Sequence, residues 1–509
     1  MNKPAIEVEV HTALRDYIRA CGDRGWPHHL TMARLVARAL KLGRSGLLQT
    51  ESSFAKYCLG YIMPALLSNG VAIVAPEDIL DRLLKEEIPT LSSWLGVTKK
   101  VRIGKEWQSE DEILLVTPQD WLSDRLNQQH FPSDIPTIID SAGELEEWTR
   151  QALTIQIQQQ DWLELIAANP QEQDTIRDLS VQLTKLVFNR PTNRYECFLF
   201  DPQELKLVKS CCDSIASKGS LTPKFQQLHQ AVSHQPSRSR YGSGQHYLIW
   251  VERDRSLGVW TIFVAPGEVA PSLEGIWQQQ PVVLIGSFLD REPKASIYRE
   301  KLGLPEMLTV KFAPNQQQDL IRLFIPDRFP LANTPQYSTA LNEKINTLVG
   351  FSQNNSKFVV ILVEDVPLRG QVASNLAAKY GTVVKVDTTE VNPTGILVCG
   401  WEFWKQQQDY LPTPQLLIMT TLPLPTLEHP IVASRVELYK YRRQDWFRGY
   451  LLPTALKNIQ QAIVPLRESQ GIVALLDSRV NFRSYGKTIL SVLEPCARIN
   501  YIDPTWFLH

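Results

Sequence analysis

The segment from Arg435 to Tyr450 mixes cationic and aromatic side chains more densely than any other part of the chain. Lysine and arginine can neutralise phosphates and aromatic rings can stack on bases, so this composition predicts sequence-tolerant binding of a single nucleic-acid strand. The alternative is a solvated basic helix face whose rings pack inward, and the sequence leaves both interpretations open. The residues predicted to bind nucleic acid are Arg435, Lys440, Arg442, Arg443, Trp446 and Arg448.

Another candidate for strand binding is the stretch 236–244, PSRSRYGSG, which carries Arg238, Arg240 and Tyr241. Its composition is equally typical of a plain disordered linker.

Asp140 ends the apolar run PTIID, which we expect to be a buried strand. A polar residue at the carboxyl edge of a parallel sheet lies where ligands bind in α/β proteins. An Asp at a strand end is also a common cap or loop residue, so Asp140 alone establishes no site.

Metal chemistry has little support in the sequence. The seven cysteines form no C-x-x-C pair, and the adjacent residues His28 and His29 point in different directions on a helix. We therefore predict no metal site, with free thiols in a reducing cytoplasm.

Composition indicates a globular protein of several domains. The 509 residues carry 53 Lys plus Arg against 54 Asp plus Glu, a formal charge of -1, which excludes a protein that coats nucleic acid by bulk electrostatics. No apolar run is long enough to cross a membrane, and charges interrupt the N-terminal stretch. We expect a cytoplasmic protein without a membrane segment.

Two α/β rhythms predict two parallel sheets. In the first, apolar strands such as VAIVAP and EILLVTP alternate with amphipathic helices, and PVVLIGSFL is a further buried strand that can return to this sheet. In the second, which begins near residue 356, the strands are KFVVILVED, TVVKVD, TGILVCG, QLLIMTTLPL and GIVALLDSR.

The region between the two rhythms is mainly helical. From Glu144 to about residue 235 it is rich in Gln and has one strand pattern, YECFLF, before a hairpin formed by HYLIWVER and VWTIFVAP. We therefore expect a first parallel-sheet domain in two parts, residues 1–148 and 271–335, an inserted helical domain with a hairpin, residues 149–270, and a second parallel-sheet domain, residues 336–509.

A series of short phrases in residues 399–490 resembles the second motor domain of the DinG/XPD group of superfamily 2 DNA helicases. In chain order they are CGWEFWKQQQD, LLIMTTLPLPTLEHPI, DWFRGYLLPTALKNIQQ, GIVALLDSRV and FRSYGKTIL. Looser matches in the N-terminal half are TESSFAKYCLGYIMPAL, IIDSAGELEEW, IGSFL and YREKLGL. The resemblance implies two RecA-like domains with an arch-like insertion, ATP and Mg²⁺ as cofactors, single-stranded DNA as partner, and a role in DNA repair.

The nucleotide-binding loop of the family is degenerate here. Residues 52–57 contain no glycine, although glycines let backbone N–H groups curl around phosphates. By the resemblance, Tyr57 stands at the lysine position and Lys56 falls one residue early, a shift that turns a side chain by about 100° on a helix. The remnants are Ser53, Lys56 and Tyr57, with His29 at the position of the glutamine that contacts adenine. The alternative is a plain helix N-terminus packed on a sheet.

The catalytic motifs are also incomplete. The resemblance allows Asp140 to hold Mg²⁺ through water, but Ser141 replaces the glutamate that orients the attacking water. In the arginine-finger helix Val464 occupies the first Arg position and only Arg467 remains. Asp409 matches an aspartate of the family's FWEGVD phrase. The family's iron–sulfur cluster needs four cysteines between the first two motifs, where this chain has only Cys58, so we predict none.

These departures favour a helicase fold that binds nucleic acid, and possible protein partners, without working ATP hydrolysis. Two alternatives stay open. One is an active, divergent ATP-dependent helicase in which Lys56, Asp140 and Arg467 form an unusual nucleotide site. The other is a protein-interaction scaffold that has lost the nucleic-acid groove as well.

Overall fold

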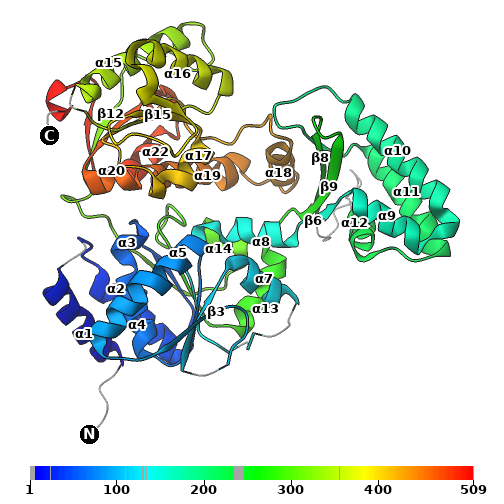
Figure 1. The fold of residues 1–509 in the computed structure, drawn as a ribbon, viewed down its shortest axis with the longest axis horizontal. Coiled ribbons are helices and arrows are strands. Elements are labelled where there is room, and N and C mark those ends of the chain that lie inside the picture. The colour runs from blue at the N-terminus through cyan, green and yellow to red at the C-terminus, as the bar shows by residue number, and fades with distance from the viewer. Residues whose placement is uncertain are drawn as a thin grey trace.

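The computed structural model describes residues 6–22, 25–108, 111–127, 131–132, 134–233, 246–354 and 356–507, and Figure 1 shows three parts. Two α/β domains lie one above the other, and a third part projects from one side of them. Arg238, Arg240 and Tyr241 of the predicted linker lie outside the described residues.

The first domain is built on a parallel seven-stranded sheet. Its order is β11 (Leu308–Lys311), β1 (Gly46–Gln49), β10 (Val282–Gly286), β5 (Thr137–Ile139), β2 (Val71–Val74), β4 (Glu112–Val116) and β3 (Lys100–Ile103). The central strands are buried on both faces, which explains their continuous apolar runs.

Helices cover both faces of this sheet. One face packs against α1 (Ile6–Cys21), α2 (His29–Leu42), α3 (Phe54–Tyr57), α4 (Leu59–Leu67), α5 (Glu77–Arg82), the π-helical turn η1 (Leu83–Glu87) and α6 (Ile88–Leu95). The other packs against α7 (Pro118–Asn127), η2 (Ala142–Glu144), α8 (Leu145–Leu153), α13 (Ala270–Gln279) and α14 (Ser296–Leu302).

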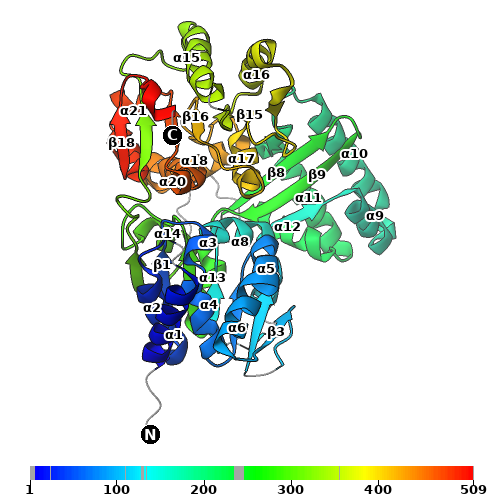
Figure 2. The same cartoon turned by 60° about the vertical axis from the view of Figure 1, so that its left-hand side comes forward.

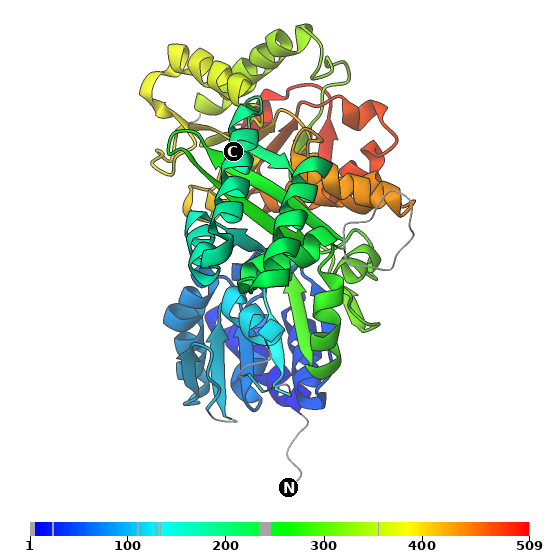
Figure 3. The same cartoon turned by 90° about the vertical axis from the view of Figure 1, so that its right-hand side faces the viewer.

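The inserted part leaves the first domain after α8 and returns before α13. It has an antiparallel sheet in the order β6 (Ile155–Ile157), β9 (Val259–Pro266), β8 (Tyr247–Asp254) and β7 (Cys197–Leu199). Against it pack α9 (Gln159–Ala168), η3 (Pro170–Glu172), α10 (Gln173–Asn189), α11 (Pro202–Lys218) and α12 (Pro223–Ser233), which form one core with the sheet. Figure 3 shows these helices and the long β8–β9 hairpin in front.

The second domain has its own parallel seven-stranded sheet. The order is β14 (Val384–Val386), β15 (Ile396–Cys399), β13 (Val359–Leu362), β16 (Leu416–Met419), β17 (Ile472–Leu475), β12 (Ile321–Phe324) and β18 (Cys496–Ile499). Because β12 pairs with β17 and β18, the chain enters this sheet before residue 336, earlier than the predicted boundary.

One face of the second sheet packs against α15 (Gln336–Gln353), α16 (Val366–Tyr380) and η7 (Pro504–Phe507), and the turn η4 (Gly381–Val383) joins α16 to β14. The other packs against α17 (Trp401–Gln407), α19 (Leu452–Ala462), α20 (Val464–Ser469), α21 (Arg479–Phe482) and α22 (Gly486–Leu493), and the turn η5 (Gln408–Tyr410) follows α17. In Figures 1 and 2, α17, α19 and α20 lie on the side of this domain that faces the first domain. α18 (Pro430–Tyr441), followed by the π-helical turn η6 (Phe447–Leu451), packs against β7 and β8 of the insertion.

The predicted fold class is confirmed: the chain is α/β, with two RecA-like parallel-sheet domains and an insertion in the first. The short strands β6 and β18 have no pattern that predicts them, because three or four residues are too few to show a period. Over the described residues, the structure has no helix that is both long and apolar enough to cross a membrane.

Candidate nucleotide site and interdomain cleft

Two tyrosines close off Asp140 at the carboxyl edge of the first sheet. Tyr57 of α3 donates its hydroxyl to one carboxylate oxygen of Asp140 at 2.6 Å, and Tyr61 of α4 donates to the other at 2.7 Å. The backbone N–H of Ser141 also donates to Asp140, at 2.5 Å. Asp140 itself is fully buried. Both carboxylate oxygens are thus already hydrogen-bonded inside the protein.

Burial raises the pKa of Asp140 above its usual value, even though the two tyrosine hydrogen bonds favour the ionised form. A carboxylate that binds Mg²⁺ must present an oxygen to the ion or to its water shell. Here a tyrosine side chain stands at the expected lysine position and uses that oxygen instead. Asp140, a candidate Mg²⁺ ligand by sequence, is in the structure an acceptor for buried tyrosines.

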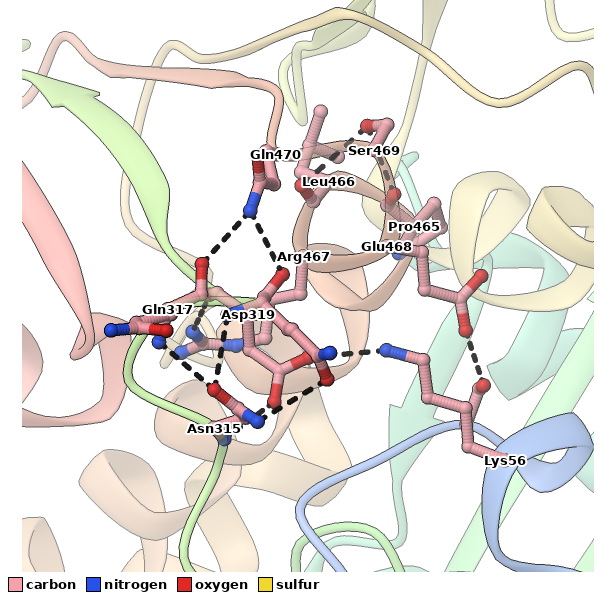
Figure 4. Close-up of polar contacts among 12 residues, drawn as sticks. Lys56, Asn315, Gln317, Asp319, Pro465, Leu466, Arg467, Glu468, Ser469 and Gln470 are labelled. Carbon is pink, nitrogen blue, oxygen red and sulfur yellow. Dashed lines mark hydrogen bonds and ion pairs between the residues drawn. The ribbon is translucent and has the colours of Figure 1, made fainter. Parts of the chain in front are cut away.

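The loop that follows β1 directs its polar side chains toward the second domain. Ser53 donates its hydroxyl to the carboxylate of Glu468 on α20, and Lys56 forms an ion pair of 3.1 Å with Asp319, which precedes β12. Figure 4 shows Lys56 reaching across the gap between the two ribbons. Glu51 adopts a positive φ of 50° and accepts a hydrogen bond of 2.6 Å from Gln460 of α19. Ser53 and Lys56 are therefore engaged between the domains.

Arg467, the remnant of the arginine finger, is buried and bonded to the backbone of its own domain. Its guanidinium donates to the carbonyls of Asp319 at 3.0 Å, Val492 at 3.3 Å and Glu494 at 2.8 Å. Because the side chain is only 4% exposed, it presents no charge to the cleft. In the structure Arg467 holds backbone carbonyls of its own domain, and its role in catalysis stays a prediction.

The remaining candidates lie around the same end of the cleft. Asp409 on η5 faces the cleft, where partial loss of solvent around its carboxyl and the charge of Asp78 raise its pKa. Ser141 adopts a positive φ of 54° and lines the cavity there. His29 lies on α2 with its ring packed edge-on against Trp26 and is 2% exposed. The structure thus places His29 in the core of the first domain, and its assignment to adenine binding stays a prediction.

Glu144 connects the acidic box to the second domain. Its carboxylate pairs with Lys457 of α19 at 2.6 Å and with Lys405 of α17 at 3.1 Å, and it accepts a hydrogen bond of 3.1 Å from Gln461. Lys457 also donates to the carbonyl of Gly143 at 2.7 Å. Gly143 and Glu144, which follow Asp140, are therefore bound to the second domain.

The contacts of Glu144 predict that the folded protein loses stability in acid. Burial alone would raise the pKa of Glu144, but the charges of Lys457 and Lys405 outweigh it and lower the pKa from 4.5 to about 2. A depressed folded-state pKa stabilises the protein above pH 4.5, and this stability is lost as the pH falls toward about 2. Glu144→Gln should lower the urea midpoint at neutral pH and flatten its dependence on pH in that window. An unchanged pH profile in Glu144→Gln would contradict this assignment.

A cavity of about 1660 Å³ lies between the two domains. At one end it is lined by Tyr57, Asp78, Ser141 and Asp409. Its cationic lining residues are Arg291, Lys301, Lys405, Arg435, Arg448, Lys457, Arg479 and Arg483, and its acidic ones are Asp78, Glu144, Glu146, Glu147, Asp290, Glu292, Glu402, Asp409 and Asp445. With this balance of charges the cavity as a whole does not select an anion, and the acidic end beside Tyr57 disfavours phosphate.

The predicted nucleic-acid segment divides into a buried and an exposed part. Arg435 pairs with Glu146 of α8 and lies 4.2 Å over the Tyr450 ring, which itself stacks on Tyr439. These side chains join α18 to the first domain, so the inward-packing interpretation holds for them. Arg435 is thus engaged between the domains, and its assignment to strand binding stays a prediction.

The exposed part of the segment keeps several cations at the surface. Lys440 lies 5.6 Å over the Trp446 ring, and Arg442 pairs with Glu268 near the end of the insertion. Arg443 is exposed at a positive φ of 57°. The side chain of Arg448 is 75% exposed and lies 3.9 Å from Asp445. Lys440, Arg442, Arg443 and Arg448 can therefore approach a phosphate chain, beside the half-buried Trp446.

Several residues that shape the site were missed by sequence reasoning. Tyr61, Glu51, Glu144 and Lys457 each act through a partner more than 70 residues away along the chain. The sequence feature that could have indicated these contacts is the acidic cluster in GELEEW, because a cluster of carboxylates predicts cationic partners elsewhere in the fold.

Comparisons with known proteins agree with the helicase resemblance of the sequence. Residues 409–496 match the family described as Helicase C-terminal domain. The chain is 29% identical over 106 residues to the ATP-dependent DNA helicase YoaA of Escherichia coli (strain K12), and 20% identical over 330 residues to the 3'-5' exonuclease DinG of Bacillus subtilis (strain 168). These alignments cover 20% and 58% of this chain, but only 17% and 35% of the length of the two relatives.

Solved structures show the same fold over nearly the whole chain. The structure of S. tokodaii Xpd4 superposes with a TM-score of 0.59 at 15% identity, covering 93% of this chain and 99% of that one. An apo XPD structure superposes with a TM-score of 0.57 at 10% identity, covering 92% of this chain and all of the other. At such identities the likeness establishes the fold.

Proposed function

We propose that this chain, a DinG/XPD-like superfamily 2 helicase in its fold and its C-terminal domain, is a nucleic-acid-binding pseudo-helicase that has lost ATP hydrolysis. The single observation that carries the proposal is the buried Tyr57–Asp140–Tyr61 cluster. By the family resemblance, the buried, neutral ring of Tyr57 stands where a triphosphate needs a lysine, and its hydroxyl occupies the carboxylate that would hold Mg²⁺.

The other catalytic parts support the same conclusion. Hydrolysis needs a residue that orients the attacking water and a cation that stabilises charge on the transferred phosphoryl group. Ser141 cannot take the first role, and Arg467 is committed to backbone carbonyls. The active-helicase alternative would require Lys56, Asp140 and Arg467 together, and each of them has another partner in the structure.

The function that remains is that of a passive platform for a single strand. Lys440, Arg442, Arg443 and Arg448 would contact phosphates, and Trp446 would stack on a base. DNA is the first strand to test, since the relative YoaA is named as a DNA helicase. A cytoplasmic location, a role in DNA repair and protein partners are parts of the same proposal.

Strand binding should depend on salt. For single strands the logarithm of the binding constant falls with a slope of about -0.7 per phosphate neutralised. Arg442→Glu/Arg443→Glu should weaken binding of a fluorescein-labelled oligonucleotide and make the slope shallower by about 0.7 for each phosphate that is no longer neutralised. Fluorescence anisotropy at several salt concentrations measures both quantities.

The control for this experiment is Lys206→Glu/Lys209→Glu, which makes the same change in net charge on α11 of the insertion. If both variants behave alike, the site lies elsewhere. If the unmodified protein binds neither DNA nor RNA at low salt, the scaffold alternative replaces our proposal.

A further inference from the structure

The loop between β1 and α4 is tied to the second domain by three side chains. Ser53 bonds to Glu468, Lys56 pairs with Asp319 at 3.1 Å, and Glu51 accepts from Gln460 at 2.6 Å. All three come from the stretch that the family resemblance aligns with a nucleotide-binding loop. The loop thus makes contacts across the domains instead of around phosphates.

Asp319, the partner of Lys56, is itself hydrogen-bonded within the second domain. Asp319 accepts from the backbone N–H of Asn315 at 2.6 Å, and its carbonyl accepts from Arg467 (Figure 4). Its side chain is 8% exposed and that of Lys56 is 17% exposed. Because solvent reaches this pair poorly, salt screens it less than a surface ion pair.

Glu144 supplies a separate tie at the acidic box, through Lys457 and Lys405. The two ties come from different segments of the first domain. The first, from residues 51–56, contacts α19, α20 and Asp319 before β12, and the second, from Glu144, contacts α17 and α19. Two ties at different points oppose a hinge movement that would open the cleft, since both must break for the domains to separate.

We propose that these ties hold the two motor domains closed without nucleotide, so that residues of the chain itself replace the ligand-driven closure of a motor. A ligand can shift a conformational equilibrium only by its difference in affinity for the two states. Ion pairs bridge the domains between Lys56 and Asp319 and from Glu144 to Lys405 and Lys457. Hydrogen bonds from Gln460 to Glu51 and from Ser53 to Glu468 add to them. The cleft is therefore fixed in width, and a strand meets a preformed surface.

This inference goes beyond the proposed function and is separable from it. A protein that binds no strand could still be closed, and a strand-binding protein could still open and close. The experiment below therefore contains no nucleic acid.

The test uses the full chain and two double variants. Lys56→Gln/Glu144→Gln removes one charge from each tie. The matched control, Lys85→Gln/Glu86→Gln, also removes one Lys and one Glu, both exposed on η1 of the first domain, where Lys85 pairs with Asp81. Hydrogen exchange of residues 52–58 reports on the loop, and small-angle X-ray scattering reports on the overall dimensions. Both are measured with and without Mg²⁺ and a nonhydrolysable ATP analogue.

We expect the unmodified protein to show the same radius of gyration and the same slow exchange in both conditions. The Lys56→Gln/Glu144→Gln variant should exchange in residues 52–58 on the order of tenfold faster and become larger, whereas the control should match the unmodified protein. A decrease in radius when the analogue is added to the unmodified protein overturns the proposal. So does a double variant that behaves like its control. If the double variant does not fold, the comparison of the unmodified protein with and without the analogue still decides the question.

Discussion

Asp140→Ala should destabilise the first motor domain by about 2–4 kcal/mol, although the residue would be a metal ligand in an active helicase. The substitution leaves the buried hydroxyls of Tyr57 and Tyr61 without their acceptor, and each buried donor left unsatisfied costs about 1–3 kcal/mol. Removing the buried carboxylate offsets part of this loss of stability, because moving a carboxylate from water into the protein interior is itself unfavourable. Urea unfolding followed by circular dichroism measures the net loss.

Removing all three polar groups should restore part of that stability. In Tyr57→Phe/Tyr61→Phe/Asp140→Ala no donor or acceptor of the cluster is left unpaired, and replacing both partners of a hydrogen bond can be nearly neutral. We expect the triple variant to be more stable than Asp140→Ala alone. The control Asp78→Ala, an exposed residue of the same cavity, should change stability by less than about 1 kcal/mol. Asp140→Ala as stable as this control would show that the cluster does not support the fold.

ATP should not stabilise the purified protein, and the protein should not hydrolyse ATP. A ligand present at about 100 times its dissociation constant adds about 2.7 kcal/mol to folding, and this would be seen as a clear rise in the melting temperature. Because Tyr57 fills the lysine position and the nearby carboxylates Asp78 and Asp409 repel phosphate, we expect no rise with ATP, ADP or a nonhydrolysable analogue in the presence of Mg²⁺.

Hydrolysis of ATP should be absent for a second reason, the missing catalytic groups. Losing one group that stabilises the transferred phosphoryl group typically costs on the order of 10²–10⁵ in rate, and here the water-orienting glutamate and the free finger arginine are both missing. Phosphate release is measured with and without single-stranded DNA, and Arg467→Lys serves as the comparison variant. Strand-stimulated phosphate release that Arg467→Lys reduces would establish the active-helicase alternative instead.

The parallel sheets could be predicted because their central strands are buried on both faces, so each appears in the sequence as a short run of apolar residues. VAIVAP corresponds to β2 and KFVVILVED to β13. Edge strands such as β3 and β18 are exposed or half-exposed and carry mixed residues, and they left no such run. β12 was not predicted as a strand at all, and the predicted boundary after residue 335 therefore left its residues in the first domain.

By itself, the sequence determined the fold class and the departures of residues 52–57 from the family's glycine-rich loop, because both depend on residues that are neighbours along the chain: apolar runs, absent glycines, and a lysine displaced by one position. Only the tertiary structure decided what the displaced groups do. Tyr57 and Asp140 are 83 residues apart, Lys56 and Asp319 are 263 apart, and Ser53 and Glu468 are 415 apart. Such contacts arise because the path of the chain through two sheets brings the carboxyl edge of one sheet against the helices of the other. The spacing of residues along the chain does not predict which of them become neighbours there.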